Sequence, residues 1–472
     1  MSTPLLYKAY DSTLFKQEGE ALIAHIANHL ETTISGSNDT VINWTEPNDE
    51  YAFWKKFVAQ EHTTTSFFKT VLDRSIHIHH PKYIGHQISP TVPVSALATL
   101  LSAQLNNGAA IYEMGAATTA LERLVIELFT QKIGYINGDG FLTSGGTLAN
   151  LTALLAARRV KASTDIWNDG HDKKLAILVS EEAHYCVDRS ARIMGLGADG
   201  IIKIPTNEKY QINTNLLEKY YTSTINNGFE VIAIVGSAPS TSTGVYDDLD
   251  AISAFAKAKN IWFHIDAAHG GAAIFSNTYK YVLNGVQKAD SIIIDGHKMM
   301  GTSAITTAVL FKESTSSYAT FEQKAQYLWE KNDDPEWFNL AKRTFECTKS
   351  MMSLRFYAII NAYGTQFFDD FVTSLYDAGR DFANYIKDQP DFELALEPIS
   401  NIVCFRYTAM QGDINSTNQK IRRALLEDGT FYIVATTLGS DYYLRTTFMN
   451  PFTTSEHTIQ LIQKIRVIVL TM

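Results

Sequence analysis

The chain has 472 residues, of which 45% are hydrophobic and 11% aromatic, so it can bury a large core and form one large domain with smaller flanking parts. A formal net charge of −10 without any basic cluster argues against nucleic acid or an anionic membrane surface as a partner. Three scattered cysteines, Cys186, Cys347 and Cys404, exclude a disulfide framework, and no stretch resembles a signal peptide or a membrane span, so we expect a soluble, cytoplasmic protein.

Residues 1–75 carry amphipathic patterns and are expected to form a helical N-terminal segment. Apolar residues recur at helical spacing over residues 22–30, and a second apolar segment rich in aromatic residues covers residues 51–58. The polar stretch from Ser35 to Asp39 separates the two segments and predicts a loop between them.

Four histidines lie within ten residues after this segment, at His77, His79, His80 and His86. Imidazole is a common metal ligand, but the spacings of these histidines match no zinc pattern. We therefore predict no metal site in this chain.

From Asn137 onward, apolar runs alternate with helical patterns, which is typical of a sheet built from strand–helix–strand units. The predicted strands are Leu175–Val179, Ile201–Ile204, Val231–Val235, Ile261–Ile265, Ser291–Ile294 and Ile305–Phe311. The sequence thus predicts a large α/β domain over residues 76–355.

After about residue 350 the pattern changes to helix, strand, helix, two strands and a last helix, which predicts a small α+β domain over residues 356–472. Gly429 is placed to end the helix expected over residues 416–427. The last helix is expected to open with a capping box formed by Thr453 and Glu456.

The candidate for chemistry is Lys298, which follows the β-branched run that begins at Ser291. A buried strand of a parallel sheet would deliver His297 and Lys298 to its carboxyl end, where open α/β sheets bind ligands. Burial favours the neutral amine, which is the nucleophile that forms a Schiff base. On these residues alone, a lysine that extends its charged end to solvent is an equally good interpretation.

A glycine pair inside Thr143-Ser-Gly-Gly-Thr147 precedes a strongly helical stretch. The free backbone N–H groups of a helix start can bind a phosphate without any side-chain charge. A simple glycine turn before a core helix is the commoner meaning of such a pair.

Two further candidates stand at strand ends. Asp266 is followed by small residues, so its carboxylate could hold a pyridine nitrogen protonated while a flat ring lies against the backbone, although a lone aspartate there is more often a helix cap. His184 could stack on such a ring, although by itself it fits a hydrogen-bonded structural histidine better.

Taken together, the order of phosphate loop, histidine, acid and lysine resembles the group II pyridoxal-phosphate-dependent amino-acid decarboxylases, and the resemblance runs from about His79 to the C-terminus. It implies the type I (aspartate aminotransferase-like) fold, with a large mixed-sheet α/β domain and a small C-terminal α+β domain. It also implies pyridoxal 5'-phosphate as the cofactor and a homodimer.

The same resemblance assigns roles to individual residues. It implies that Lys298 binds the cofactor covalently, that Asp266 pairs with the ring nitrogen and that His184 stacks on the ring, and these three are the implied catalytic residues. The implied cofactor-binding residues are Gly145, Gly146, Thr147, His184, Ser237, Asp266, Ala268, His297 and Lys298.

The implied reaction is decarboxylation of an L-amino acid to its amine and carbon dioxide. Residues 81–90 and 180–185 are similar in layout to the diaminobutyrate and lysine-type members, so we expect an aliphatic substrate, diamino or acidic, rather than an aromatic one. A catalytically inactive binding protein and an aminotransferase are alternatives; the intact Lys298, Asp266 and His184 argue against the first, and a keto-acid product would identify the second.

Three departures from the family pattern stand out: Asp295-Gly296 before His297, Pro239 in place of a common glycine, and Phe338 where several members carry a tyrosine. In those members the tyrosine lies on a loop that follows the lysine in sequence, and it donates the proton that completes amine formation. Tyr327 is the nearest tyrosine on the corresponding loop of this chain and is the alternative donor. Loss of the donor is associated in the family with oxidative, aldehyde-forming chemistry, which is the alternative reaction.

Overall fold

The computed structural model describes residues 5–321, 336–409 and 412–472. Contacts within the chain divide it into a large unit, residues 87–384 and 396–404, and a small unit, residues 1–86, 385–395 and 405–472. None of the helices in these described ranges has the length and apolar character needed to cross a bilayer. The domain boundaries expected at residues 75 and 355 stay predictions.

The large unit contains a seven-stranded mixed sheet with the order β1-β7-β6-β5-β4-β2-β3. Strands β3, β2, β4, β5 and β6 run parallel, whereas β7 lies antiparallel to both β6 and β1. The strands are β1 Asp139–Thr143, β2 Lys174–Ser180, β3 Ile201–Ile204, β4 Phe229–Ser237, β5 Trp262–Asp266, β6 Ser291–Asp295 and β7 Thr307–Phe311. The expected α/β class and the six predicted strands are confirmed. Strand β6, which precedes Lys298, has a parallel neighbour, β5, on one side and an antiparallel neighbour, β7, on the other.

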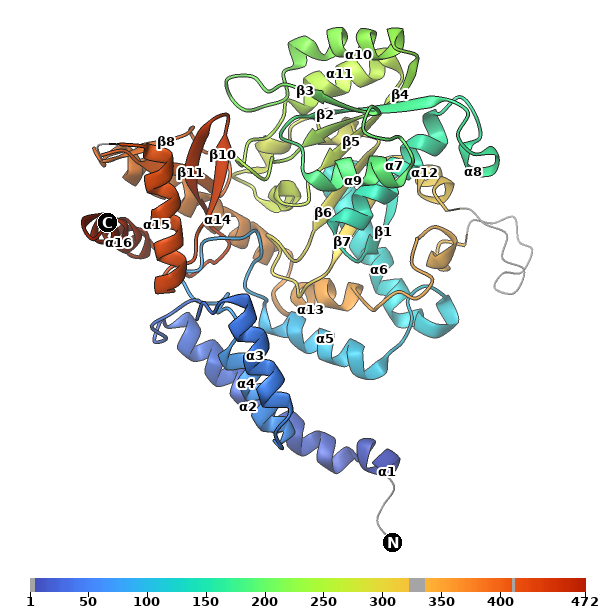
Figure 1. Cartoon of the computed structure of the whole chain (residues 1–472). Coiled ribbons are helices and arrows are strands. Elements are labelled where there is room, and N and C mark those ends of the chain that lie inside the picture. The colour runs from blue at the N-terminus through green and yellow to red at the C-terminus, as the bar shows by residue number, and fades with distance from the viewer. Residues whose placement is uncertain (1–4, 322–335, 410–411) are drawn as a thin grey trace. The chain divides into compact units, whose positions relative to one another are not determined.

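Helix α7 (Gly146–Lys161) packs across strands β4 to β7, and Figure 1 shows α9 (Tyr185–Ile193) beside it. The contact face of α7 is built from Ala149, Ala153, Ala156 and Ala157, whose small side chains let the helix approach the sheet closely. The other helices that begin in this unit are α5 Pro93–Leu105, α6 Tyr112–Ile133, α8 Ile166–Asp169, α10 Leu217–Asn226, α11 Leu249–Lys259, α12 Ser314–Ala319, α13 Ser353–Tyr363 and α14 Gln366–Lys387. Short 3-10 helices cover Thr214–Leu216, Gly270–Phe275, Lys280–Leu283, Val286–Lys288 and Leu340–Lys342.

Strand β1 escaped the sequence analysis because it holds a charged residue and a glycine, Asp139 and Gly140, in five positions. The structure explains why each of these two residues is present. A Cβ on Gly140 would collide with the carbonyl oxygen of Val309 on the neighbouring strand β7, so only glycine fits there. Strand β1 ends at Thr143 and therefore leads directly into the glycine pair before α7.

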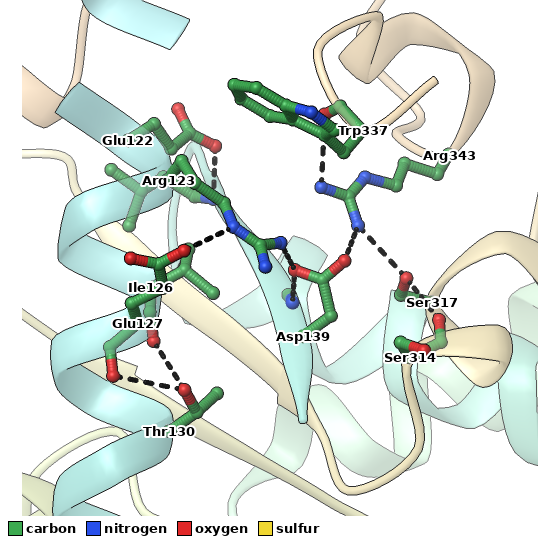
Figure 2. A network of polar contacts seen from close by, with 12 residues as sticks. Glu122, Arg123, Ile126, Glu127, Thr130, Asp139, Ser314, Ser317, Trp337 and Arg343 are labelled. Carbon is green, nitrogen blue, oxygen red and sulfur yellow. Dashed lines mark hydrogen bonds and ion pairs between the residues drawn. The ribbon is translucent and has the colours of Figure 1, made fainter. Parts of the chain in front are cut away.

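A polar network fixes the start of β1 (Figure 2). Asp139 accepts hydrogen bonds from Arg123 of α6 (3.0 Å) and from Arg343 (2.6 Å), and Arg343 also donates to Ser317 (3.1 Å). Asp139 and Arg343 are buried, so the pair satisfies two charges that would otherwise be costly in the interior. This network ties the strand that leads to the glycine pair to the segment around residue 343.

The small unit combines helices with a four-stranded sheet of order β10-β11-β9-β8. Its elements are α1 Leu5–Ala9, α2 Ser12–Ile34, α3 Pro47–Val58, α4 Thr64–Asp73, β8 Phe392–Leu394, β9 Ile402–Tyr407, α15 Ile414–Asp428, β10 Val434–Leu438, β11 Asp441–Thr447 and α16 Ser455–Leu470, although β9 begins in the large unit. The helices of the N-terminal segment, the loop from Ser35 to Asp39 between two of them and the ending of α15 at Gly429 (φ +75°) are confirmed.

The predicted capping box of the last helix was wrong by one residue. Thr454, not Thr453, caps α16, and its partner at the third helical position is His457 rather than Glu456. Thr453 instead donates a hydrogen bond to the carbonyl of Pro81 (2.6 Å). A histidine ring can accept the backbone N–H that a glutamate accepts in the usual motif, and the sequence pattern gave no weight to that option.

Candidate active site

A cavity of about 330 Å³ lies in the large unit where strands β4, β5 and β6 end. The last residues of these strands, Ser237, Asp266 and Asp295, all line it, as expected for ligand binding at the carboxyl edge of an open α/β sheet. All nine predicted cofactor-binding residues surround this one cavity: Gly145, Gly146, Thr147, His184, Ser237, Asp266, Ala268, His297 and Lys298.

The start of α7 forms one wall of the cavity. Gly145 precedes the helix with φ +105°, a conformation that favours glycine, and the turn leaves the first N–H groups of a 16-residue helix at the cavity. A Cβ on Gly146 would lie 3.2 Å from both carboxylate oxygens of Asp295, so a larger residue would crowd this wall. The helix start can therefore bind an anionic group through its backbone.

Lys298 lies in the turn that follows β6 and lines the same cavity. Its Nζ is 3.2 Å from Oδ2 of Asp295, and its side chain is 20% exposed. The hydroxyl of Thr307 also hydrogen-bonds the Asp295 carboxylate, while His297 Nδ1 lies 3.1 Å from the carbonyl of Thr306. The lysine is thus held by a carboxylate at the cavity wall and does not extend away into solvent.

Asp266 presents a carboxylate whose orientation is fixed on both oxygens. Oδ1 accepts a hydrogen bond from the backbone N–H of Ala268 (3.2 Å), and Oδ2 accepts one from Nδ2 of Asn150 on α7 (3.0 Å). The hydrogen bond to Ala268 belongs to the turn after β5, so Asp266 does not cap a regular α-helix. The carboxylate can therefore accept a further donor from within the cavity.

His184 has a structural role as well as a place in the cavity. It is the N-cap of α9, where its Nδ1 accepts the backbone N–H of Cys186 (3.3 Å). Burial lowers the pKa of His184, which favours the neutral ring. A neutral ring held flat by its own helix cap is well suited to pack against another planar group.

Several residues of the cavity were missed by the sequence analysis. Asn150 contacts Asp266, Asp295 contacts Lys298, and Cys186 lies with its Sγ 3.1 Å from Asn150 Nδ2. One signal was available for Asn150, because a lone amide within the Ala- and Leu-rich stretch of α7 must find a buried partner. Another was available for Asp295, because an acid that ends an apolar strand shares the cavity edge with the lysine that follows.

The histidines His77 and His80 bond backbone carbonyl oxygens, those of Thr40 (3.0 Å) and Asn38 (3.1 Å). In the part of the chain that the structure describes, the only group of three or more His, Cys, Asp or Glu side chains close enough to share an ion is His184, Cys186 and Asp266. That group lies in the cavity described above. His77 and His80 therefore have a structural explanation in their hydrogen bonds.

The cavity residues fit pyridoxal 5'-phosphate. The helix start suits its phosphate, the Lys298 amine suits its carbonyl carbon, and the Asp266 carboxylate suits its protonated ring nitrogen. The cavity volume also falls within the range of small-molecule sites, about 300–1,000 Å³. Gly296 is needed here too, because a Cβ at that position would collide with the ring of Phe356.

Comparison with known proteins gives a consistent result. Residues 65–408 match the family model described as the pyridoxal-dependent decarboxylase conserved domain. An L-2,4-diaminobutyrate decarboxylase of Acinetobacter baumannii is 29% identical over 414 residues, covering 84% of this chain and 81% of that protein. An aspartate 1-decarboxylase of Aliivibrio fischeri is 28% identical over 446 residues, covering 84% and 80%.

Among solved structures, the fold is similar to a protein from Vibrio parahaemolyticus. This is the glutamate decarboxylase domain of diaminobutyrate-pyruvate transaminase and L-2,4-diaminobutyrate decarboxylase, with a TM-score of 0.85 and 24% identity over 97% of this chain and 96% of that one. At this identity the likeness establishes the fold.

Proposed function

Because the chain belongs to the pyridoxal-dependent decarboxylase family and is a pyridoxal-phosphate-dependent amino-acid decarboxylase, we propose that it converts an aliphatic L-amino acid, diamino or acidic, to its amine and carbon dioxide. The observation that supports this substrate class is the pair of relatives named for diaminobutyrate and aspartate, each aligned over four fifths of its length. Both of those substrates are aliphatic amino acids with a second charged group.

In this proposal each of the nine predicted cofactor-binding residues has a task. Lys298 would hold the cofactor covalently, Asp266 would hold a proton at the ring nitrogen, and the start of α7 would bind the phosphate through Gly145, Gly146 and Thr147. His184 and Ala268 would pack against the two faces of the ring, while Ser237 and His297 would contact its polar groups. When bound, the protonated ring accepts the electron pair of the breaking Cα–carboxylate bond.

The substrate proposal is tested by measuring carbon dioxide and amine release from a panel of L-amino acids. The panel contains 2,4-diaminobutyrate, lysine, aspartate and glutamate against tryptophan, tyrosine and phenylalanine, with aldehyde and peroxide measured in parallel. We expect turnover of a diamino or acidic member to exceed that of every aromatic one. Preferential turnover of an aromatic amino acid would reject the proposed class and leave the decarboxylase assignment in place.

Aldehyde formation is the second candidate reaction, and Phe338 is the observation that favours it. Its ring packs against Tyr112 and Trp337, with ring centroids 5.4 and 5.8 Å apart, so the position expected to carry a tyrosine hydroxyl carries only hydrocarbon. Tyr327, the alternative donor, lies outside the described residues.

We expect Phe338→Tyr to raise the ratio of amine to aldehyde, because the new hydroxyl adds a proton donor at the predicted position. Product analysis by mass spectrometry measures this ratio. Trp337→Tyr is the matched control, since it places the same hydroxyl one residue away. A wild-type enzyme that releases only amine would show that the donor lies elsewhere.

We further propose a homodimer that works in the cytoplasm. Helix α5 exposes Leu97, Leu100, Leu101 and Leu105 by 47–53% each, at helical spacing, which is more apolar surface than a solvated helix face usually carries. None of the three cysteines, all of which lie in the described ranges, forms a disulfide, as is usual in a reducing compartment.

A lysine in place of Leu101 should weaken the dimer, because burying the new charge at the interface is unfavourable. Light scattering is expected to show a shift toward monomer together with loss of activity. Ala103→Lys is the control, because it adds the same charge at an exposed position of α5 that lies about 200° round the helix from Leu101. A monomeric wild-type protein with full activity would disprove the dimer.

A further inference from the structure

A line of buried polar side chains ends at the carboxylate of Asp266. The proposed mechanism uses Asp266 but gives the other side chains of the line no role. Trp262, His264 and Asp266 alternate along β5 and therefore point to the same face of the sheet. Ser291 lies beside His264 on the neighbouring strand β6, and Asn150 faces them from α7. Apart from Asp266, each of these side chains is at most 2% exposed.

Hydrogen bonds join these side chains without a gap. Trp262 Nε1 donates to Ser291 Oγ (2.8 Å), and Ser291 Oγ lies 2.8 Å from His264 Nδ1. His264 Nε2 lies 2.7 Å from Asn150 Oδ1, and Asn150 Nδ2 donates to Asp266 Oδ2 (3.0 Å). We call Trp262, Ser291, His264 and Asn150 the relay.

The chemistry of the relay allows only one direction. Since Asn150 uses its NH₂ group toward Asp266, the group it turns to His264 is an acceptor, and His264 must therefore donate from Nε2. Burial lowers the pKa of His264 to about 4, so the ring is neutral near pH 7 and its Nδ1 accepts the Ser291 hydroxyl. Every proton in the line points toward Asp266.

We propose that the relay, with His264 and Asn150 as positioning residues, holds the Asp266 carboxylate in place and in its acceptor state for the ring nitrogen of the cofactor. Hydrogen bonds that all run in the same direction polarise one another and become stronger. Loss of the hydrogen bonds of His264 should therefore weaken the hydrogen bond from Asn150 to Asp266. The inference rests on the proposed role of Asp266. It assigns a function to two buried residues, His264 and Asn150, that would act through Asp266.

The test compares His264→Leu, which removes both hydrogen bonds, with His264→Gln, whose amide retains a donor and an acceptor. We expect His264→Leu to lower kcat by about 10- to 100-fold, the range typical for groups that orient a reacting ligand, with little change in KM. His264→Gln should recover most of the rate. Phe263→Leu, a buried change on the opposite face of β5, is the matched control and should keep the wild-type kcat.

A readout independent of turnover is the visible absorption band of the bound cofactor, titrated with pH. Its midpoint should shift in His264→Leu in the same direction as in Asp266→Asn and stay unchanged in Phe263→Leu. A double variant, His264→Leu with Asp266→Asn, should fall no further than Asp266→Asn alone, because the relay acts through that carboxylate. If the fold-losses in kcat of the two single variants instead multiply in the double variant, His264 acts independently of Asp266, and the proposal is overturned.

Two outcomes separate this inference from the function on which it rests. Wild-type kcat and midpoint in His264→Leu, with Asp266→Asn impaired, would reject the relay and keep the role of Asp266. An unimpaired Asp266→Asn would instead reject the role of Asp266 itself. If His264→Leu does not fold, Ser291→Ala and Trp262→Phe break the same line with smaller changes and are expected to shift the midpoint in the same direction; unchanged midpoints in both would overturn the relay.

Discussion

Replacing Lys298 with alanine is expected to abolish decarboxylation while leaving the fold intact. The side chain reaches the cavity at the end of β6, where its Nζ lies 3.2 Å from Asp295 and where it can hold the cofactor covalently. Without the amine the cofactor has no covalent attachment, and we expect a rate loss on the order of 10³-fold or more. Carbon dioxide release measures the rate, and circular dichroism with thermal unfolding checks the fold.

Lys288→Ala is the matched control, because that lysine is half exposed and pairs with Asp250 away from the cavity. Borohydride reduction of the wild-type protein followed by peptide mass spectrometry should find the cofactor on Lys298. The assignment fails if Lys298→Ala keeps substantial decarboxylation or if the reduced cofactor is found on another lysine.

The buried strands of the large unit are predictable from the sequence, because β-branched apolar runs such as Ser291–Ile294 bury both faces and need no partner to be recognised. Strand β1 is not predictable in this way. Asp139 and Gly140 are there because of what lies across the sheet, the buried Arg343 and the backbone of β7, and both come from residues about 170 to 200 positions later in the chain.

The residues of the candidate site also differ in whether the sequence alone can identify them. Residues whose chemistry follows from their place at a strand or helix end, such as Lys298 and Asp266, can be selected from the sequence and lie around one cavity. The lone amide of Asn150 is visible in the sequence, but the partners of Asn150 and His264 are not, because their hydrogen bonds reach residues on other elements. Asp266, for example, is 116 positions from Asn150. A buried amide or imidazole has no local pattern that reveals which carboxylate it orients.

Asp266→Asn should lower the rate far more than it lowers cofactor content. The substitution preserves size and the hydrogen bond from Ala268, but it removes the negative charge. In the proposed role of Asp266 this charge keeps a proton at the ring nitrogen, so its loss should weaken the electron sink. We expect kcat to fall on the order of 10²-fold or more, with bound cofactor close to the wild-type amount, because Lys298 and the start of α7 still hold it.

Absorbance of the bound cofactor and a single-turnover assay separate these two quantities. Asp250→Asn makes the same chemical change on a surface carboxylate and should leave both unchanged. Cofactor loss in proportion to the rate loss would mean that Asp266 serves binding rather than electronics. Full activity would mean that the ring nitrogen is paired by another group, and other polar side chains such as those of Ser237 and Asp295 line the same cavity.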